Sequence, residues 1–254
     1  MKIFENLNQY SCLIHCYGVT QEPNTQNYAL VLRFMENGSL RSYLNQNFNS
    51  LTWIQKLFII FGISHGLCFI HRENLTHKDL HLGNVLQSKD ITIFGIYISG
   101  KKYTQKSDVY SFGIIMNEII SIVPPFNNEP HDEHLALDIC RGKRPKIRKE
   151  TPEFFKELIQ KCWDANPENR PTSEDLYYIF EVDGYVELEN LEELTYDFTE
   201  STNTKLFETH PQAIYTSRLL NFSNLPEPVN CPNQEEFVSS RHGKFIITLF
   251  YFLL

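Results

Sequence analysis

The sequence predicts a mainly α-helical domain of the α+β class, in which a few short strands accompany a set of apolar helices. Two observations predict this class. Apolar stretches with helix caps recur between residues 52 and 180, whereas β-prone runs are short and occur at 10–35 and 84–94. In addition, 42% of the 254 residues are hydrophobic and 13% are aromatic, which is enough to build a packed core and excludes wholesale disorder.

The N-terminal part of the domain is expected to be extended. Residues 12–20 contain short apolar runs, residues 21–27 form a polar turn, and residues 28–34 (YALVLRF) have β-prone side chains. Residues 36–39 (ENGS) break the second extended segment, and a short helix begins at 40–44.

Two long helices are expected to form the core. The first opens with a capping box at Thr52 and Gln55, runs to about residue 71, and is apolar on nearly every side. The second, at 109–122, is expected to be capped by Ser107 and Asp108. Helices that are apolar all round belong in a protein interior, so these two define the centre of the domain.

Shorter elements complete the expected fold. Strands at 84–86 and 91–94 lie between the two core helices in the sequence. Three further helices are expected: one at 134–140, one that starts at the cap formed by Thr151 and Pro152, and one from Thr172 to about residue 180.

Charge and cysteine content limit the partners and the compartment. The net charge is −8, from 23 basic and 31 acidic side chains, so the chain has no overall attraction for nucleic acid. Its six cysteines are scattered without a Cys-x-x-Cys pair, and neither a disulfide framework nor a zinc site is expected. We therefore expect a reducing, cytoplasmic environment and no nucleic-acid partner.

The composition changes after residue 184. Residues 184–254 are acidic and polar, and we expect them to form a tail of low order. The tail ends in an apolar run at 245–254, which supplies about half of the roughly 20 residues that a membrane-spanning helix needs. No membrane span and no secretory signal are expected.

One segment carries recognisable chemistry, the sequence HKDLHLGN at residues 77–84. Asp79 is followed five residues later by Asn84, in a loop between a buried helix and a short strand. The carboxylate can accept or orient the proton of an attacking hydroxyl group, and the amide oxygen can hold a metal ion against nucleotide phosphates. This arrangement suits phosphoryl transfer.

The same segment resembles the catalytic loop of protein kinases, His-Arg-Asp-Leu-x-x-x-Asn. Three further segments resemble kinase motifs in the expected order: residues 32–40 (LRFMENGSL) the hinge, residues 107–113 (SDVYSFG) the central helix of the large lobe, and residues 162–172 the closing signature. The residues in these motifs are most similar to those of the tyrosine-kinase-like group, whose members mostly phosphorylate Ser and Thr.

The resemblance covers about residues 10–181 and implies a protein-kinase-like fold, with a large helical lobe and only a β remnant of the small lobe. It divides the chain into a partial kinase domain at 1–183, with its hinge near 32–36 and its large lobe at 37–183, and the tail at 184–254.

The resemblance also implies site residues and cofactors. Asp79 corresponds to the catalytic base and Asn84 to a ligand of the second metal ion, with ATP and Mg²⁺ as the family's cofactors. At the adenine site, Met35 corresponds to the residue that offers its backbone, Leu32 to the gatekeeper and Leu86 to the floor.

Other positions correspond to structural residues of the family. Asp108 is expected to brace the backbone around His77, while Phe94 and Arg170 occupy further structural positions. His81 departs from the Ser/Thr-kinase pattern, which usually has Lys there, but the tyrosine-kinase-like group tolerates other residues at this position.

Three parts of the family pattern are missing. The first is the phosphate-covering region, because no Gly-x-Gly-x-x-Gly occurs and Lys2 is the only lysine before Lys56. From this we expect the ATP-clamping lobe to be largely absent.

The second missing part is a metal ligand. Kinases end the strand after the catalytic loop with Asp-Phe-Gly, and this chain has Ile93, Phe94 and Gly95. Isoleucine offers no oxygen to Mg²⁺, which requires oxygen ligands.

The third is the activation segment. Twelve residues, 96–107, separate Gly95 from Asp108, and no Ala-Pro-Glu motif lies among them. Arg170, which pairs with the Glu of that motif in the family, must therefore find another acid, face water, or be buried at a cost of a few kcal/mol.

The resemblance and the missing parts lead to two hypotheses. The family activity is ATP-dependent phosphorylation of proteins, but the chain as written is expected to be a catalytically impaired, pseudokinase-like fragment. Such a fragment would hold partner proteins on the surface around the helix at 134–140. The alternative is an active kinase whose missing segments reflect an incomplete gene model.

Overall fold

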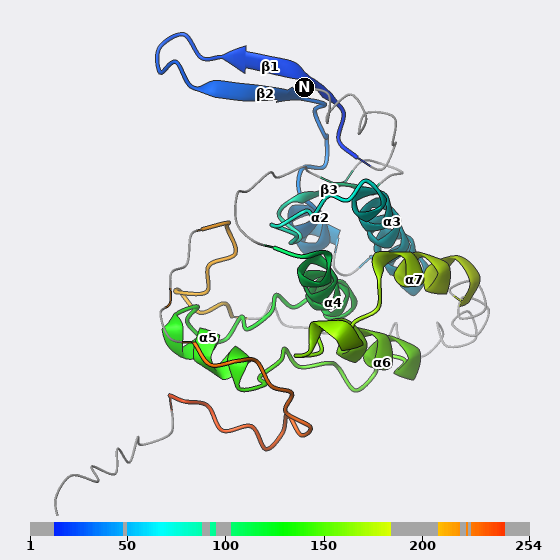
Figure 1. The fold of residues 1–254 in the computed structure, drawn as a ribbon, viewed down its shortest axis with the longest axis vertical. Helices are drawn as coiled ribbons and strands as arrows, with labels where there is room; N and C mark the ends of the chain where they lie inside the picture. Colours follow the sequence, from blue (N-terminus) through cyan, green and yellow to red (C-terminus); the bar gives the residue numbers. More distant parts are fainter. Residues whose placement is uncertain are drawn as a thin grey trace, which may run out of the picture.

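The computed structural model describes residues 13–47, 50–87, 92–94, 103–183, 208–218, 222 and 225–241, with only the backbone given at 92–94 and 182–183. Most of the described chain forms a helical lobe, and a two-stranded hairpin projects from one end of it (Figure 1). The predicted mainly helical architecture with few strands is confirmed.

The centre of the lobe is α3 (Trp53–Arg72), which packs against α4 (Gln105–Ser121) and α7 (Ser173–Tyr178). The expected capping box is present, because the Thr52 hydroxyl accepts the Gln55 N–H and the Gln55 side chain accepts the Thr52 N–H. The nearly uniform apolar surface of α3 reflects burial on several sides. Its fully buried apolar side chains are Ile60, Ile63 and Leu67.

The remaining helices are short. They are α2 (Leu40–Asn47), α5 (Glu133–Cys140), α6 (Glu153–Cys162), the 3₁₀ turn η1 (Pro167–Asn169) and the π turn η2 (Ile179–Asp183), which continues α7. α6 packs against α4 and buries Phe155 and Ile159 completely. The buried apolar residues of α2, α6 and α7 belong to one continuous hydrophobic core with those of α3 and α4.

Two helix caps differ from the sequence expectation. α4 begins at Gln105, because Thr104 and Ser107 form a reciprocal capping box four residues before the expected start. Asp108 therefore lies in the first turn of α4, where its carboxylate can face another part of the chain. At α6, Pro152 is the N-cap residue and no side chain caps the helix, while Thr151 is buried beside it.

The strands form two separate antiparallel pairs. β1 (Cys16–Gln21) pairs with β2 (Tyr28–Leu32) in the projecting hairpin, and β3 (Val85–Gln87) pairs with β4 (Thr92–Phe94) beside the lobe. In the second pair, Leu86 lies opposite Ile93. A backbone bridge between Ser39 and Leu86 joins the segment after the hairpin to β3.

Among the described residues, α3 is the one helix long and apolar enough to cross a membrane, with a mean hydropathy of 1.5. Its packing against α4 and α7 shows that it is a core helix of this lobe, so it provides no clear membrane span.

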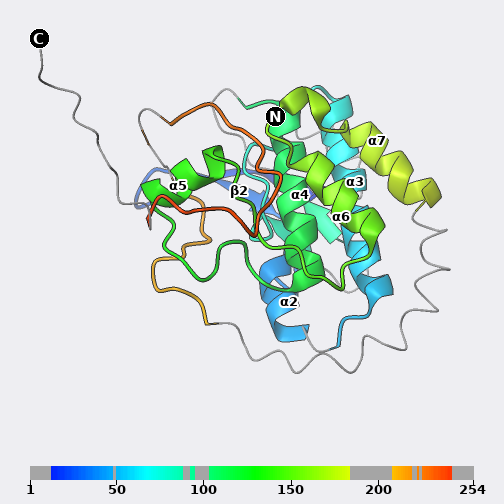
Figure 2. The same ribbon diagram turned by 90° about the horizontal axis from the view of Figure 1, so that it is seen from below.

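Parts of the sequence after residue 184 lie against the lobe. Residues 225–241 run beside α5 (Figures 1 and 2), where the Ser239 hydroxyl and the Ser240 N–H donate to the buried carboxylate of Asp138 at 2.6 and 2.8 Å. At Gly142 (φ +102°), an added Cβ would lie 2.5 Å from the backbone nitrogen of Cys231. The helix proposed from the sequence to hold partner proteins thus carries the chain's own C-terminal part, and the domain boundary at 184 stays a prediction.

Candidate active site

The catalytic-loop segment lies between the end of α3 and the start of β3, and Asp108 from α4 holds its backbone. The Asp108 carboxylate accepts the N–H groups of His77 at 2.7 Å and Lys78 at 2.9 Å, and it also bonds the buried ring of His71 at 3.0 Å. Lys78 has a left-handed backbone (φ +70°), a conformation that needs support from its surroundings in a residue other than glycine. One buried carboxylate on the first turn of α4 supplies that support.

The held loop brings Asp79 and Asn84 together. The Asn84 amide nitrogen donates to the Asp79 carboxylate Oδ2 and to the Asp79 carbonyl oxygen, each at 2.8 Å. Because both partners are acceptors, the nitrogen of the Asn84 amide must face Asp79. The two residues that the resemblance assigns to base and metal ligand are therefore in direct contact.

His81 is a neutral donor beside this pair. Burial lowers the pKa of His81, against the opposing effect of the nearby Asp79 carboxylate. Its Nδ1 accepts the N–H of Gly83 at 3.0 Å, so the ring proton resides on Nε2. A Cβ on Gly83 would lie 2.8 Å from this nitrogen, so a larger residue there would displace the His81 ring.

A residue from far along the chain completes the group. The Ser217 hydroxyl donates to Asp79 Oδ2 at 2.6 Å, and its oxygen lies 2.8 Å from His81 Nε2, from which it accepts. No sequence signal pointed to Ser217, because it lies 138 positions after Asp79 in a segment without a motif.

An ion pair between Arg41 of α2 and Glu118 of α4 supports the segment that carries Ser217. The guanidinium binds both carboxylate oxygens, at 2.9 and 3.0 Å, and a third nitrogen donates to the Tyr215 carbonyl at 3.1 Å. Burial raises the pKa of Glu118, and Arg41 opposes this shift. Sequence reasoning identified neither residue, since neither belongs to a motif and the two lie 77 positions apart along the chain.

The adenine-site positions are only partly brought together. Met35 is buried and packs with Ile14 and the half-buried Leu86 in a small apolar cluster apart from the main core. Leu32 lies on the projecting strand β2, where it pairs with Cys16 and is 37% exposed. The structure therefore groups the hinge and floor positions and leaves the gatekeeper position outside that cluster.

The position of the missing metal ligand lies on β4. The backbone of Ile93 pairs with that of Leu86, while the side chains of Ile93 and Phe94, and residues 95–102 of the short activation segment, lie outside the described residues. Among the described residues, no group of three or more His, Cys, Asp or Glu side chains could hold a metal ion. The Asn84 nitrogen faces Asp79, which leaves its Oδ1 as one possible oxygen ligand, but Ile93 offers none where the family has its metal-binding Asp, so the residues present fall short of the six oxygen ligands that Mg²⁺ prefers.

Arg170 has found partners other than an acid. It is half-buried and donates to the carbonyl oxygens of Asp164 at 2.7 Å and Lys106 at 2.9 Å. Its guanidinium carbon also lies 5.1 Å from the ring centroid of Tyr110. The guanidinium carbon of Arg144 lies 5.5 Å from the same centroid. Burial lowers the pKa of Arg170, and the ring and carbonyl contacts offset part of that cost.

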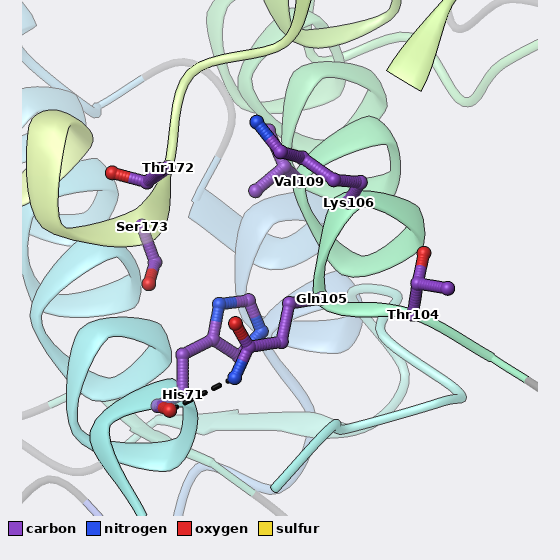
Figure 3. A pocket seen from close by; sticks show the side chains of 7 residues that line it. All are labelled: His71, Thr104, Gln105, Lys106, Val109, Thr172 and Ser173. Atoms are coloured by element: carbon purple, nitrogen blue, oxygen red, sulfur yellow. Dashed lines mark hydrogen bonds between the residues drawn. The ribbon is translucent and has the colours of Figure 1, made fainter. Parts of the chain in front are cut away.

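A cavity of about 270 Å³ lies between the C-terminal end of α3 and the N-terminal ends of α4 and α7 (Figure 3). The Gln105 side chain crosses it and donates to the His71 carbonyl at 2.8 Å. It is lined by His71, Thr104, Gln105, Lys106, Val109, Thr172 and Ser173. None of these residues is Asp79, His81, Asn84 or Ser217, so the cavity is separate from that catalytic-loop cluster.

Comparison with known proteins fits this geometry. The family model described as protein tyrosine and serine/threonine kinase matches residues 1–95 and 97–180. The chain belongs to this kinase family. The resemblance seen at residues 77–84 and in the three flanking motifs is therefore confirmed, as is the kinase-like fold with its large helical lobe.

Individual relatives match only part of this chain, and this chain matches only part of each relative. The RGS domain-containing serine/threonine-protein kinase A of Dictyostelium discoideum is 29% identical over 202 residues, which are 68% of this chain and 17% of the relative. A tyrosine-protein kinase of Girardia tigrina is 27% identical over 201 residues, which are 63% of this chain and 40% of the relative. The chain thus spans well under two thirds of the length of these relatives.

Proposed function

We propose that this chain is a pseudokinase-like member of the kinase family, which keeps the large lobe as a protein-binding body and has lost efficient phosphoryl transfer. The observation that carries the proposal is Ile93, which stands where the family has its principal metal-binding Asp. Its neighbours Phe94 and Gly95 are present, so a gap in the sequence does not account for the change.

The physical reason is the charge that develops during transfer. Metal ions stabilise the transition state of phosphoryl transfer by several kcal/mol, and about 1.4 kcal/mol corresponds to a tenfold change in rate. Loss of the main carboxylate ligand is therefore expected to lower the rate by several orders of magnitude. The short activation segment, 96–107, removes the part of the family's fold that docks protein substrates.

The first prediction concerns this activity. The purified 254-residue chain, incubated with Mg²⁺, radiolabelled ATP and a generic protein substrate, is expected to transfer no more phosphate than its Asp79→Asn variant. Ile93→Asp alone should not restore transfer, because the chain also contains no Gly-x-Gly-x-x-Gly segment. Phosphate incorporation that depends on Asp79 would contradict the proposal.

A thermal-shift titration tests nucleotide binding separately. A ligand at 100 times its Kd stabilises a protein by about 2.7 kcal/mol, which gives a measurable rise in Tm. We expect Mg²⁺ with ATP to leave the Tm where Mg²⁺ alone leaves it. A saturable rise with ATP would show a nucleotide site and would favour the second candidate function.

That second candidate is an active protein kinase, and the geometry of the catalytic loop favours it. Asp108 holds the His77 and Lys78 backbone, and Asp79 and Asn84 contact each other as the loop's roles require. In that case ATP and Mg²⁺ are the cofactors and proteins the substrates, by family.

The proposed partners of the pseudokinase-like form are proteins, as for the family. A cytoplasmic location is part of the proposal, supported by the five described cysteines, all of which are free thiols.

A further inference from the structure

Residues 210–218 cross the catalytic loop, and we name this segment the acceptor strap. Its N-terminal half is held by the loop that follows α4. The His210 N–H donates to the Asn127 carbonyl at 2.8 Å, and the His131 N–H donates to the Gln212 carbonyl at 3.0 Å. The strap is thus paired with the lobe through backbone groups before it reaches the catalytic residues (orange, Figure 1).

Tyr215 anchors the middle of the strap. Its ring lies under the Arg41 guanidinium, 4.8 Å from centroid to Cζ, and meets the His131 ring edge-on at 4.9 Å. Its hydroxyl donates to the Pro125 carbonyl at 3.0 Å, while its own carbonyl accepts from Arg41. Burial raises the pKa of Tyr215, so the phenol stays a neutral donor. A cation–π contact and two hydrogen bonds fix the residue two positions before Ser217.

Ser217 then presents its hydroxyl to the catalytic loop. The hydroxyl donates to Asp79 Oδ2 at 2.6 Å and accepts from His81 Nε2 at 2.8 Å. A general base must lie about 2.6–3.2 Å from the group whose proton it accepts, and in kinases the loop carboxylate accepts the proton of the substrate hydroxyl. Ser217 therefore occupies the position of a phosphoacceptor side chain.

The neighbouring residue shows that the fit is specific to one hydroxyl. Thr216 and Ser217 are both exposed, but Thr216 makes no hydrogen bond with any residue that the structure describes, although it carries the same functional group. Arg218, on the other side, donates to the His131 carbonyl. Of the two hydroxyl groups at Thr216 and Ser217, the strap therefore directs only that of Ser217 toward Asp79.

We propose that the acceptor strap is a built-in, substrate-like autoinhibitory segment. The catalytic loop binds its Ser217 hydroxyl in cis, and the bound strap keeps other peptides away from Asp79. The contacts that carry it come from Arg41, Asp79, His81 and the loop after α4, none of which is a nucleotide position. The inference goes beyond the proposed function and holds whether or not the chain binds ATP.

The test uses the full chain and a fluorescent peptide with the strap sequence, HPQAIYTSRLL (residues 210–220). Ser217→Glu places a second carboxylate against Asp79 and removes the donated hydrogen bond, so the strap should leave the loop. The vacated loop should then bind the peptide about tenfold or more tightly than the wild-type chain does, as measured by fluorescence anisotropy.

Thr216→Glu is the matched control, because it adds the same charge one residue away at an exposed position. Its peptide affinity should equal that of the wild-type chain. Tyr215→Ala removes the anchor without adding charge, and it should raise peptide affinity as Ser217→Glu does. Equal and undetectable peptide binding by all four chains would overturn the proposal, as would equal gains in Thr216→Glu and Ser217→Glu.

Trypsin cleavage after Arg218 measures strap release directly, because a protease needs an undocked segment. The rate should rise about tenfold or more in Ser217→Glu and stay at the wild-type value in Thr216→Glu. An unchanged rate in Ser217→Glu would overturn the proposal. Neither measurement contains nucleotide, so failure here is distinguishable from failure of the pseudokinase proposal, which only the ATP assays decide.

Discussion

At the scale of single residues, the arrangement depends on which atoms of each polar side chain are already engaged. Asp108 uses both carboxylate oxygens on the loop backbone, and Asn84 uses its amide nitrogen on Asp79. Asp79 in turn receives hydrogen bonds from Asn84 and Ser217 on the same oxygen, Oδ2. The residues that the family uses for catalysis are thus present, and each of them already makes a hydrogen bond within the chain.

His81 leads to a prediction on pH dependence. Burial lowers the pKa of His81 in the folded chain, whereas a histidine in an unfolded chain titrates near about 6.5. As the pH falls through about 6.5, His81 is protonated in the unfolded state but stays neutral in the folded state. The unfolded state therefore binds more protons, and the free energy of unfolding decreases. The contribution of His81 is fully present above that pH and is lost below it.

The measurement is urea denaturation at pH 7.5 and 5.5 for the wild-type chain and for His81→Gln. The wild-type chain should lose more stability on acidification than the variant, since glutamine does not titrate. Equal losses of stability in the two chains would show that His81 does not cause the pH dependence. The half-buried His65, whose pKa is also lowered by burial, would then be the histidine that accounts for it.

At the scale of elements, the close approach of α4 and α6 depends on a glycine inside a helix. A Cβ at Gly113 would lie 2.8 Å from the Cβ of Cys162 and 3.3 Å from the carbonyl oxygen of Ile159. Backbone and side chain of α6 therefore occupy the space that an alanine would need. The glycine lets the two helices share the core with no gap between them.

We predict that Gly113→Ala destabilises the chain by about 1–3 kcal/mol through overpacking, although alanine favours an isolated helix by about 1 kcal/mol. Urea denaturation measures the effect. Ser111→Ala, on the same helix and only partly buried, should change the free energy of unfolding by less than about 0.5 kcal/mol. Stabilisation by Gly113→Ala would mean that α4 and α6 are further apart than described.

At the scale of the whole molecule, residues far apart in the sequence join into one body. The strap lies on the catalytic loop and the loop after α4, and residues 225–241 lie along α5 (Figure 2). Asp138, which is fully buried on α5, holds the second segment through Ser239 and Ser240. The catalytic loop and one side of α5 are thus covered by other parts of the same chain.

This covering predicts a local effect of Asp138→Asn. The amide cannot accept both hydrogen bonds as the carboxylate does, so residues 225–241 should detach and trypsin should cut after Arg241 about tenfold faster. Cleavage after Lys56, in the first turn of the core helix α3, reports unfolding of the core and should not change. A parallel increase at both sites would indicate global destabilisation in place of local release.

The sequence by itself determined the family, the helical class and the catalytic loop, because these depend on local patterns: capping boxes, apolar periodicity and the spacing of Asp79 and Asn84. Helix starts were less predictable, as α4 shows, since the sequence pattern predicts the cap at Ser107 and Asp108, whereas Ser107 is the third residue after Thr104 in a capping box that begins at Thr104. Only the tertiary structure decided what Asp79 faces. Ser217 reaches it through long-range contacts of Tyr215, Arg41 and His131, and no local pattern encodes contacts between residues so far apart along the chain.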